Sequence, residues 1–568
     1  MIKRFSFAAE FVFYALLATS GLWHSSVSFG ALAPKATEAE AVRFLRQATW
    51  GPNRISILRI QQQGIDAWLT AQFRMRGRAF PNLRPYPESQ PQNCSETCVR
   101  DNYTYYQLQK HFFSNALAGQ DQLRQRVAFA LSQIFVTGQS AIPMPAWMRV
   151  YQQMLYENAF GNYRELLYDI TLNPAMGRYL DMLNNRCQTR VPNDVNVCRN
   201  GSSAQPNENF AREILQLFSI GTFMLNQDGT YQTMPDPINP TVQIPIPTYD
   251  QAKVEEFARV FTGWVLNTPV RGIGGDLPNY QKPMVVRRNS QGQEMHHDRG
   301  AKVLLNNFPI PANTDAEVEL NLAIDNIVSH PNVAPFISKQ LIRHLVMSNP
   351  SPAYVARVAA VFTANTNAPN QLEHVVRAIL MDTEARTLPT SATDPDAGKL
   401  NEPVVFMLNF LRAFEARSDG VLNGGSTGSA AMNQDVFRSP TVFNYYPAEY
   451  EVPGEPNLVG PVFGIFSTQS TITRANFINR ALFTGIPRAL PNTPMGTTLN
   501  LRTWEQLADT PDQLVDRLSC LLLACTMSQQ MKTIIINAVN TIPITELELR
   551  AQTAIYLVAT SNHFQVLR

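Results

Sequence analysis

A dense group of polar side chains lies in a short stretch near residue 210. It comprises two amides, two carboxylates and a guanidinium, from Asn207, Glu208, Asn209, Arg212 and Glu213. Asn207 follows a proline and is of a type that caps helices, which places Glu208 in the first turn, where the helix dipole favours a negative charge. Glu208 and Arg212 are then spaced to form an ion pair. A capped surface helix explains this much, whereas a binding or catalytic role requires Asn209 or Glu213 to face a cleft.

Two imidazoles and a carboxylate follow one another at His296, His297 and Asp298, just before Gly300. Histidine titrates near neutral pH, and imidazoles and carboxylates both bind metal ions and exchange protons. His297 and Asp298 are therefore acid–base candidates, together with Glu213. Neighbouring side chains on a strand point to opposite faces, so one metal site rarely uses both histidines. The pattern favours a hydrogen-bonded loop, and we expect no bound metal or other cofactor.

Two cations, Lys339 and Arg343, lie four residues apart in an amphipathic segment. On a helix this spacing puts both charges on one face, where they repel each other unless a negative group lies between them. That group is either a glutamate from another helix or an anionic ligand.

The composition excludes several classes of protein. The chain has 568 residues, of which 45% are hydrophobic and 16% charged, so it can bury a large core and is neither disordered nor a small disulfide scaffold. Lysine and arginine number 47 and aspartate and glutamate 45, which gives a net charge of +2 and disfavours nucleic acid as a partner. The sequence has no H-E-x-x-H zinc helix, P-loop or dinucleotide-binding glycine motif.

Residues 1–30 have the pattern of a secretory signal peptide. Lys3 and Arg4 precede an apolar run at 11–18, and the small residues Ser28 and Gly30 precede a cleavage point before residue 31. An uncleaved membrane anchor is the alternative, although the run is short for a bilayer. No later segment has about 18 consecutive apolar residues, so the sequence predicts a periplasmic or secreted protein without a transmembrane span in the mature chain.

The six cysteines fall into three local pairs, Cys94 with Cys98, Cys187 with Cys198, and Cys520 with Cys525. In an exported chain, close pairs favour local disulfides. Zinc is the alternative, but the spacings differ from paired C-x-x-C knuckles.

Helical periodicity dominates the chain and predicts a mainly α fold. The apolar spacing predicts helices at 39–48, 122–135, 164–172, 210–218, 253–261, 334–346, 354–362, 403–414, 511–523 and 552–559. Prolines between residues 234 and 250 predict a long extended loop, and 284–288 with 293–296 predict a short β-hairpin. We find no repeat or linker, so residues 31–568 are expected to form one large multi-helix domain with long Pro-rich loops.

Several phrases together resemble the bacterial domain of unknown function 1800 family, over nearly the whole mature chain. They include Arg43-Phe44-Leu45-Arg46-Gln47-Ala48-Thr49-Trp50-Gly51-Pro52, Asn207-Glu208-Asn209-Phe210-Ala211-Arg212-Glu213, Phe261-Thr262-Gly263-Trp264, His297-Asp298 and Ser439-Pro440-Thr441-Val442-Phe443-Asn444. The resemblance implies one exported helical domain whose molecular activity is unassigned. It also implies another exported protein, related to sulfatases and phosphatases, as a candidate partner.

The central helix departs from the family pattern. Members often read Arg-Glu-Leu-x-Glu-Leu-His there, whereas this chain has Gln216 and Phe218 at the positions of the second acid and the imidazole. Two potential metal ligands are therefore lost, which disfavours a metal site on this helix.

Two functions follow as hypotheses. The first is a noncatalytic cell-envelope or extracellular helical protein that binds or scaffolds an exported protein or an envelope polymer. The second is an extracytoplasmic hydrolase of an anionic or carbohydrate substrate, in which Glu213 works with His297 or Asp298 and the 339/343 cations hold the anion. We also expect the 208–213 helix and the 297–298 loop to lie close together, and if they do, we expect Arg212 to bridge carboxylates of both segments.

We predict export with cleavage after Gly30, because a basic start, an apolar run and small residues follow one another in the required order. N-terminal sequencing of the periplasmic or secreted product should begin at Ala31. An intact Met1 on a cytoplasmic product would contradict export.

Overall fold

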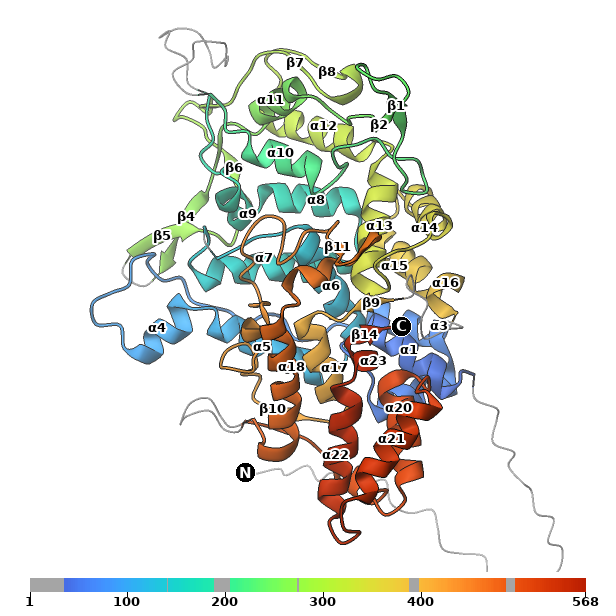
Figure 1. Cartoon of the computed structure of the whole chain (residues 1–568). Helices are drawn as coiled ribbons and strands as arrows, with labels where there is room; N and C mark the ends of the chain where they lie inside the picture. The colour runs from blue at the N-terminus through green and yellow to red at the C-terminus, as the bar shows by residue number, and fades with distance from the viewer. Residues whose placement is uncertain (1–34, 140, 188–204, 273–274, 388–397, 487–495) are drawn as a thin grey trace, which may run out of the picture. The chain divides into compact units, whose positions relative to one another are not determined.

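Helices form most of the regular structure, as the apolar periodicity predicts (Figure 1). The computed structural model describes residues 35–139, 141–187, 205–272, 275–387, 398–486 and 496–568. Within these ranges the chain forms 23 α-helices and only short two-stranded sheets, and Lys35–Arg568 is a single unit around one principal core. The fold is therefore mainly α and single-domain, as expected.

The helices up to residue 260 are α1 (Glu38–Ala48), α2 (Arg54–Gln63), α3 (Ile65–Arg74), α4 (Glu96–Tyr103), α5 (Tyr106–Ala118), α6 (Gln122–Ile134), α7 (Pro145–Glu157), α8 (Tyr163–Leu172), α9 (Pro174–Tyr179), α10 (Asn209–Gln216) and α11 (Gln251–Val260). Those that follow are α12 (Ala316–Val328), α13 (Val333–Leu345), α14 (Pro352–Ala364), α15 (Gln371–Met381), α16 (Thr383–Arg386), α17 (Pro403–Ala413), α18 (Thr468–Asn479), α19 (Arg502–Glu505), α20 (Pro511–Leu523), α21 (Gln529–Asn540), α22 (Leu547–Ala559) and α23 (Asn562–Gln565). All ten predicted helices are present, with small shifts at their ends.

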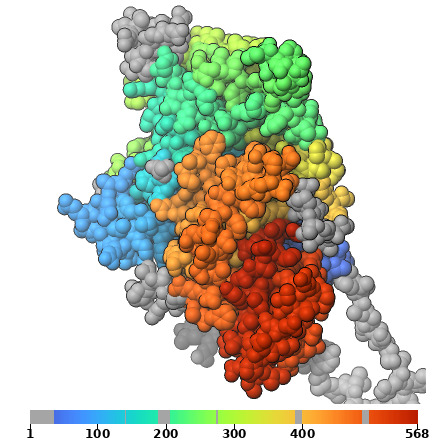
Figure 2. All heavy atoms as spheres, viewed as in Figure 1, coloured from blue at the N-terminus to red at the C-terminus, as the bar shows by residue number. Residues whose placement is uncertain are grey.

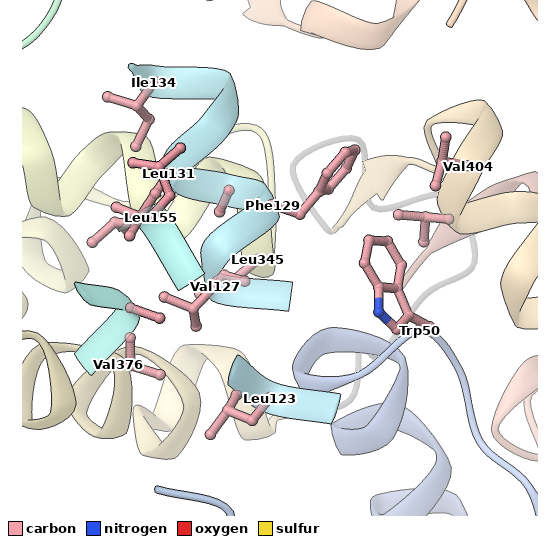
Figure 3. Close-up of a cluster of buried hydrophobic side chains, with 14 of the residues drawn as sticks. Trp50, Leu123, Val127, Phe129, Leu131, Ile134, Leu155, Leu345, Val376 and Val404 are labelled. Atoms are coloured by element: carbon pink, nitrogen blue, oxygen red, sulfur yellow. The ribbon is translucent and has the colours of Figure 1, made fainter. Parts of the chain in front are cut away.

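Helix α6 lies in the core and is buried on most of its surface. Leu123, Val127 and Leu131 repeat at helical spacing, and Figure 3 shows them facing apolar side chains of other helices. The neighbours include α3, α7 and α13, and Trp50 meets Phe129 with 5.2 Å between ring centroids. Burial of such side chains from many helices holds the domain together.

The Pro-rich segment is more regular than predicted. Instead of a purely extended loop, it forms a small hairpin of β1 (Thr233–Pro235) and β2 (Gln243–Pro245). Pro235 and Pro245 each end a strand, where the missing N–H costs least in the ladder. The expectation of an extended loop is therefore wrong for these residues.

The hairpin predicted at 284–288 and 293–296 is confirmed as a tight turn but not as a regular two-stranded pair. Asn289 N donates to Gln293 O at 2.9 Å, and Met295 N donates to Arg287 O at 2.7 Å. The regular strand β6 (Val285–Val286) pairs instead with β3 (Trp264–Val265).

The remaining strands are short and antiparallel. They are β4 (Asn267–Gly272) with β5 (Gly275–Asn279), β7 (Lys302–Val303) with β8 (Pro309–Ile310), β9 (Lys399–Leu400) with β14 (Val566–Leu567), β10 (Arg417–Ser418) with β13 (Thr497–Thr498), and β11 (Glu451–Val452) with β12 (Glu455–Val459).

Buried cations that bind backbone carbonyls tie distant segments together. Arg46 of α1 donates to Val566 O at 2.9 Å, and Arg412 of α17 donates to Leu117 O and Gly51 O, both at 2.8 Å. Burial lowers the pKa of both arginines to about 10, so they remain charged at neutral pH. These contacts join the first and last parts of Lys35–Arg568 in one unit.

Two of the three predicted disulfides are confirmed, Cys94–Cys98 and Cys520–Cys525. Cys198 lies outside the described residues, so its pairing with Cys187 stays a prediction. The signal peptide at 1–30 also lies outside them. No helix in the described part of the chain is long and apolar enough to cross a membrane.

Candidate anion-binding pocket

Helix α13 has two different faces, and the outer one forms the wall of a pocket. Its inner face buries Ile337, Leu341 and Leu345, and the helix packs against α6, α14 and α15. Positions at the spacing i, i+3, i+4 and i+7 lie on one side of a helix, and Phe336, Lys339, Gln340 and Arg343 have this spacing and line the pocket. The buried inner face therefore fixes the direction of both predicted cations.

The pocket has a volume of about 340 Å³. Besides α13 and the nearby Ser348, it is lined by four groups of residues: a segment at 216–231, a loop at 442–449, the pair Pro461 and Val462, and a floor from the end of α6 and the start of β9. In Figure 2 the orange part of the chain, which includes the 442–449 loop, lies at the surface of the molecule.

Lys339 lies beside a tight turn, and its ammonium group has no ion pair in the described part of the chain. The turn contains Gly229, which has a φ of +76° and places its carbonyl oxygen 3.5 Å from Lys339 Nζ. Burial lowers the pKa of Lys339 and the neighbouring Arg343 lowers it further, while Glu449 and Asp228 act in the opposite direction. The free-energy cost of burying the Lys339 charge is therefore only partly offset by these two carboxylates.

Unlike Lys339, Arg343 forms an ion pair with a carboxylate. Its Nη2 donates to Glu449 Oε2 at 3.1 Å, its Nη1 also contacts this carboxylate, and its Nε donates to Ser348 O at 3.1 Å. The first alternative, a glutamate from another helix, is right for Arg343 in the type of residue only. The carboxylate comes from an exposed loop residue rather than from a helix.

A third cation lies in the floor. Lys399 Nζ donates to His344 O at 2.7 Å and to Arg343 O at 3.1 Å, and so binds the C-terminal end of α13. Burial lowers the pKa of Lys399 to about 8, with Glu402 opposing the shift and Arg126 adding to it. His344 is neutral near pH 7, because burial and the nearby cations lower its pKa to about 3.

Sequence reasoning found Lys339 and Arg343 but not the other polar groups of this pocket. Gln340 could have been found, since it lies on the same helical face as the two cations. Gln133, Lys399 and Tyr446 gave no signal, because each comes from a segment far away in the sequence.

The 297–298 loop lies elsewhere, in a buried network of charges between α11 and α12. His297 Nε2 is 2.8 Å from Glu319 Oε2, and His297 Nδ1 is 3.0 Å from Thr262 O. Lys302 Nζ donates to Glu319 Oε1 at 2.7 Å and to Asp298 O at 2.6 Å. The side chains of His297, Asp298, Lys302 and Glu319 are at most 1% exposed. Such placement is typical of groups that hold a fold together.

Arg259 of α11 completes this network. Its Nε and Nη2 donate to the two oxygens of Asp298 at 3.0 and 3.1 Å, and its Nη1 donates to Glu256 at 2.7 Å. Arg212 instead donates to Glu208 at 2.9 Å and to Gln251 at 3.1 Å. The predicted pair of Glu208 with Arg212 is confirmed, but the expected bridge from Arg212 to the 297–298 loop is wrong.

Helix α10 begins at Asn209, one residue later than a cap at Asn207 implies. Asn207 Oδ1 still accepts from Asn209 N at 2.9 Å, but Glu208 takes the N-cap position. Asn209 Nδ2 donates to Asp181 Oδ2 at 3.3 Å. These contacts hold the start of α10 in place.

Glu213 is buried and stands apart from the histidine. Its Oε2 has no hydrogen-bond partner among the described residues, and burial raises its pKa while Arg212 opposes the shift. No hydrogen bond or ion pair in the described structure joins it to His297. None of Glu213, His297 and Asp298 lines the pocket of α13. In the described ranges, no group of three or more His, Cys, Asp or Glu side chains is arranged to hold a metal ion.

The fold and the pocket define a single-domain, mainly helical protein with a cationic pocket. A comparison with family models matches residues 43–566 to the family described as "Protein of unknown function (DUF1800)", and the chain belongs to this family. Comparisons with curated proteins and with solved structures each found no match.

We predict that Lys302→Met destabilises the protein by about 3–5 kcal/mol, since it removes one partner from a buried ion pair and leaves Glu319 with His297 alone. Urea unfolding of the mature protein measures the change. Lys282→Met, at an exposed lysine, is the matched control and should stay within about 0.5 kcal/mol of wild type. A loss below about 1 kcal/mol for Lys302→Met would show that the network does not stabilise the fold.

Proposed function

We propose that this protein works in the periplasm or outside the cell as a noncatalytic helical binding protein, and that it holds an anionic group in the pocket of α13. The observation that carries the proposal is Lys339, which lines the pocket with no ion pair among the described residues. Two disulfides support an oxidising compartment, and residues 1–30 carry the pattern of an export signal.

The charges around the pocket are unequal. Lys339, Arg343 and Lys399 contribute three cations, and Glu449 is the one carboxylate in the pocket lining. Glu449 bonds to Arg343, and Lys339 has no ion pair of its own among the described residues. Charges held in a partly desolvated recess attract an opposite charge more strongly than charges in open water. An anion between Lys339 and Arg343 would relieve their mutual repulsion.

The hydrolase alternative has less support. Its acid–base residues would have to meet beside a substrate, yet His297 lies 2.8 Å from Glu319 and Asp298 is paired with Arg259, and the side chains of His297 and Asp298 are fully buried. Glu213 contacts neither His297 nor the pocket of α13. We therefore assign binding to the pocket, with an envelope polymer or another exported protein as the source of the anion, and no nucleic acid.

The first test uses a small anion and its uncharged counterpart. Wild-type protein should bind cyclohexanecarboxylate in calorimetric titration and should not bind cyclohexanol detectably. Lys339→Met should weaken the binding on the order of tenfold, because it removes a charge-assisted hydrogen bond. Lys282→Met, outside the pocket, is the control and should bind as wild type does. Equal affinity of wild type and Lys339→Met would reject the pocket as the anion site.

The second test is the pH dependence of the same titration. The carboxylate stays ionised above about pH 6. Lys399 loses its proton near pH 8, and Lys339 loses its proton below the pH of an ordinary lysine. Each loss removes a positive charge, so affinity should be constant from pH 6 to 7 and fall as the pH rises above 8.

The neighbouring groups do not reverse this trend. Arg343, Glu449 and Asp228 face Lys339, and Arg126 and Glu402 face Lys399. Guanidiniums stay protonated and carboxylates ionised across this range. An affinity that stays unchanged up to pH 10 would contradict the role of the lysines.

A further inference from the structure

We propose that the ligand of this pocket is a small apolar carboxylate, in which the carboxylate binds at Lys339 and an attached hydrocarbon body fills the space beside it. This proposal deepens the function proposed above and rests on it. The observations that carry it are the apolar wall of the pocket, the aromatic side chains at its edge, and the way the polar groups of its floor are engaged inside the protein.

Apolar side chains form much of the wall of the pocket. They come from α6, α13, the segment at 216–231, the loop at 442–449 and the pair at 461–462, and they include Ile134, Leu217, Leu225, Phe336, Val442 and Val462. Leu217, Phe336 and Val442 are only partly buried, so part of their apolar surface still meets water. Covering such surface with the hydrocarbon part of a ligand is favourable in proportion to the area covered.

Three of the five exposed aromatic side chains in the described part of the chain line this one pocket. They are Phe223, Tyr231 and Phe443, which are 37%, 51% and 50% exposed. The rings of Phe223 and Tyr231 meet edge to face, with 5.7 Å between their centroids. Single exposed apolar side chains are common on protein surfaces, whereas a group of them at a recess is typical of a binding site. The edge of the pocket therefore favours an apolar ligand.

The polar side chains of the floor are engaged within the protein. Gln133 Oε1 accepts from Asn444 Nδ2 at 3.0 Å. The hydroxyl of Tyr446 lies 2.9 Å from Gln133 Oε1 and 3.2 Å from Glu402 Oε2, so these two oxygens share it. The Nε2 atoms of Gln133 and Gln340 are buried and do not reach the open space of the pocket. These groups therefore do not require a ligand that is rich in oxygen atoms.

The charges and the apolar surface together select the class of ligand. A small inorganic anion would match Lys339 but would leave the apolar wall and the aromatic rings in contact with water. An uncharged hydrocarbon would cover the wall but would leave the ammonium group of Lys339 without a counter-charge. A molecule that joins a carboxylate to a hydrocarbon body meets both requirements.

The volume of the pocket limits the size of this body. About 340 Å³ is near the lower limit for ligand pockets, which typically hold about 300–1,000 Å³. The space therefore suits a short acyl chain or one large apolar side chain. The shared chemistry is a small apolar carboxylate, which is either a free acid or the C-terminal residue of an exported polypeptide. The rest of such a polypeptide would leave the pocket past the exposed rings.

The first experiment compares carboxylates that differ by one feature. Calorimetric titration of the full mature protein uses butanoate, hexanoate, octanoate and gluconate. Hexanoate and gluconate have the same number of carbon atoms and one carboxylate each, but gluconate carries a hydroxyl group on every other carbon atom. We expect hexanoate to bind about tenfold more tightly than gluconate or better. From butanoate to octanoate, each added methylene group should tighten binding about two- to fourfold.

The matched variant is Phe443→Ser, which removes an exposed ring and leaves the cations in place. It should weaken octanoate binding about threefold or more and butanoate binding less, because the longer chain reaches more of the apolar surface. Lys339→Met should instead weaken all three fatty acids by the same factor. Phe308→Ser, at an exposed ring outside the pocket, is the control and should bind as wild type does. Thermal unfolding checks that each variant is folded.

A second comparison assigns the source of the carboxylate. Phenylpropanoate and an acetylated triglycyl-phenylalanine peptide carry the same ring and a carboxylate, but only the second is a polypeptide end. Tighter binding of the peptide assigns the C-terminal residue of a polypeptide, and equal or weaker binding assigns the free acid. The C-terminal amide of the same peptide should not bind detectably. Binding of the amide as tight as that of the acid would contradict the role of the carboxylate.

The outcomes separate this proposal from the one on which it rests. If gluconate binds through Lys339 at least as tightly as hexanoate, the pocket is an anion site but the apolar carboxylate is rejected. The same holds if octanoate binds no more tightly than butanoate, or if Phe443→Ser binds octanoate as wild type does. If no carboxylate binds, or if Lys339→Met binds each of them as wild type does, both proposals fail.

Discussion

The binding of buried cations to backbone carbonyls is the interaction on which most of this structure depends. A guanidinium inside a protein must keep its hydrogen bonds, and the ends of helices and loops offer carbonyls that lack an intrahelical donor. Arg412 meets this need at the end of α5, Arg550 of α22 donates to Ala508 O and Ile542 O, and Arg46 binds Val566 O. Each arginine thereby fixes two distant segments in one geometry. This explains how a chain with few charges forms one large domain.

The same interaction fixes the pocket. Lys399 of β9 binds the carbonyls of Arg343 and His344, and β9 pairs with β14, which Arg46 of α1 also holds. The end of α13 is thus connected to both the first helix and the last strand. Because the inner face of α13 is also buried, the helix cannot rotate to turn Lys339 and Arg343 away from the pocket. Lys339 and Arg343 therefore both stay directed at the pocket, where their like charges repel each other.

Two charged clusters of this protein differ in how their charges are balanced. Around Asp298 and Glu319, cations and carboxylates alternate at hydrogen-bond distance, so each of these two buried carboxylates has the opposite charge that burial requires. Around Lys339 the cations outnumber the carboxylates and the recess is open to ligands of moderate size. Buried charges that their neighbours balance need no further partner. Unbalanced charges that line a recess attract a ligand of opposite charge. This difference is the reason that we propose a binding function for the pocket of α13.

The sequence by itself determined the helical class, the ten periodic helices, the two described local disulfides and the spacing of Lys339 and Arg343, because all of these depend on neighbours within a few residues. The hairpin of β1 and β2 departed from the sequence prediction, since prolines at strand ends leave the ladder intact. Only the tertiary structure decided that Glu319 and Arg259 enclose the 297–298 loop, and that Gln133, Lys399 and Tyr446 meet α13. These partners are separated by tens to hundreds of residues, and the packing of the whole helical core decides which of them come into contact.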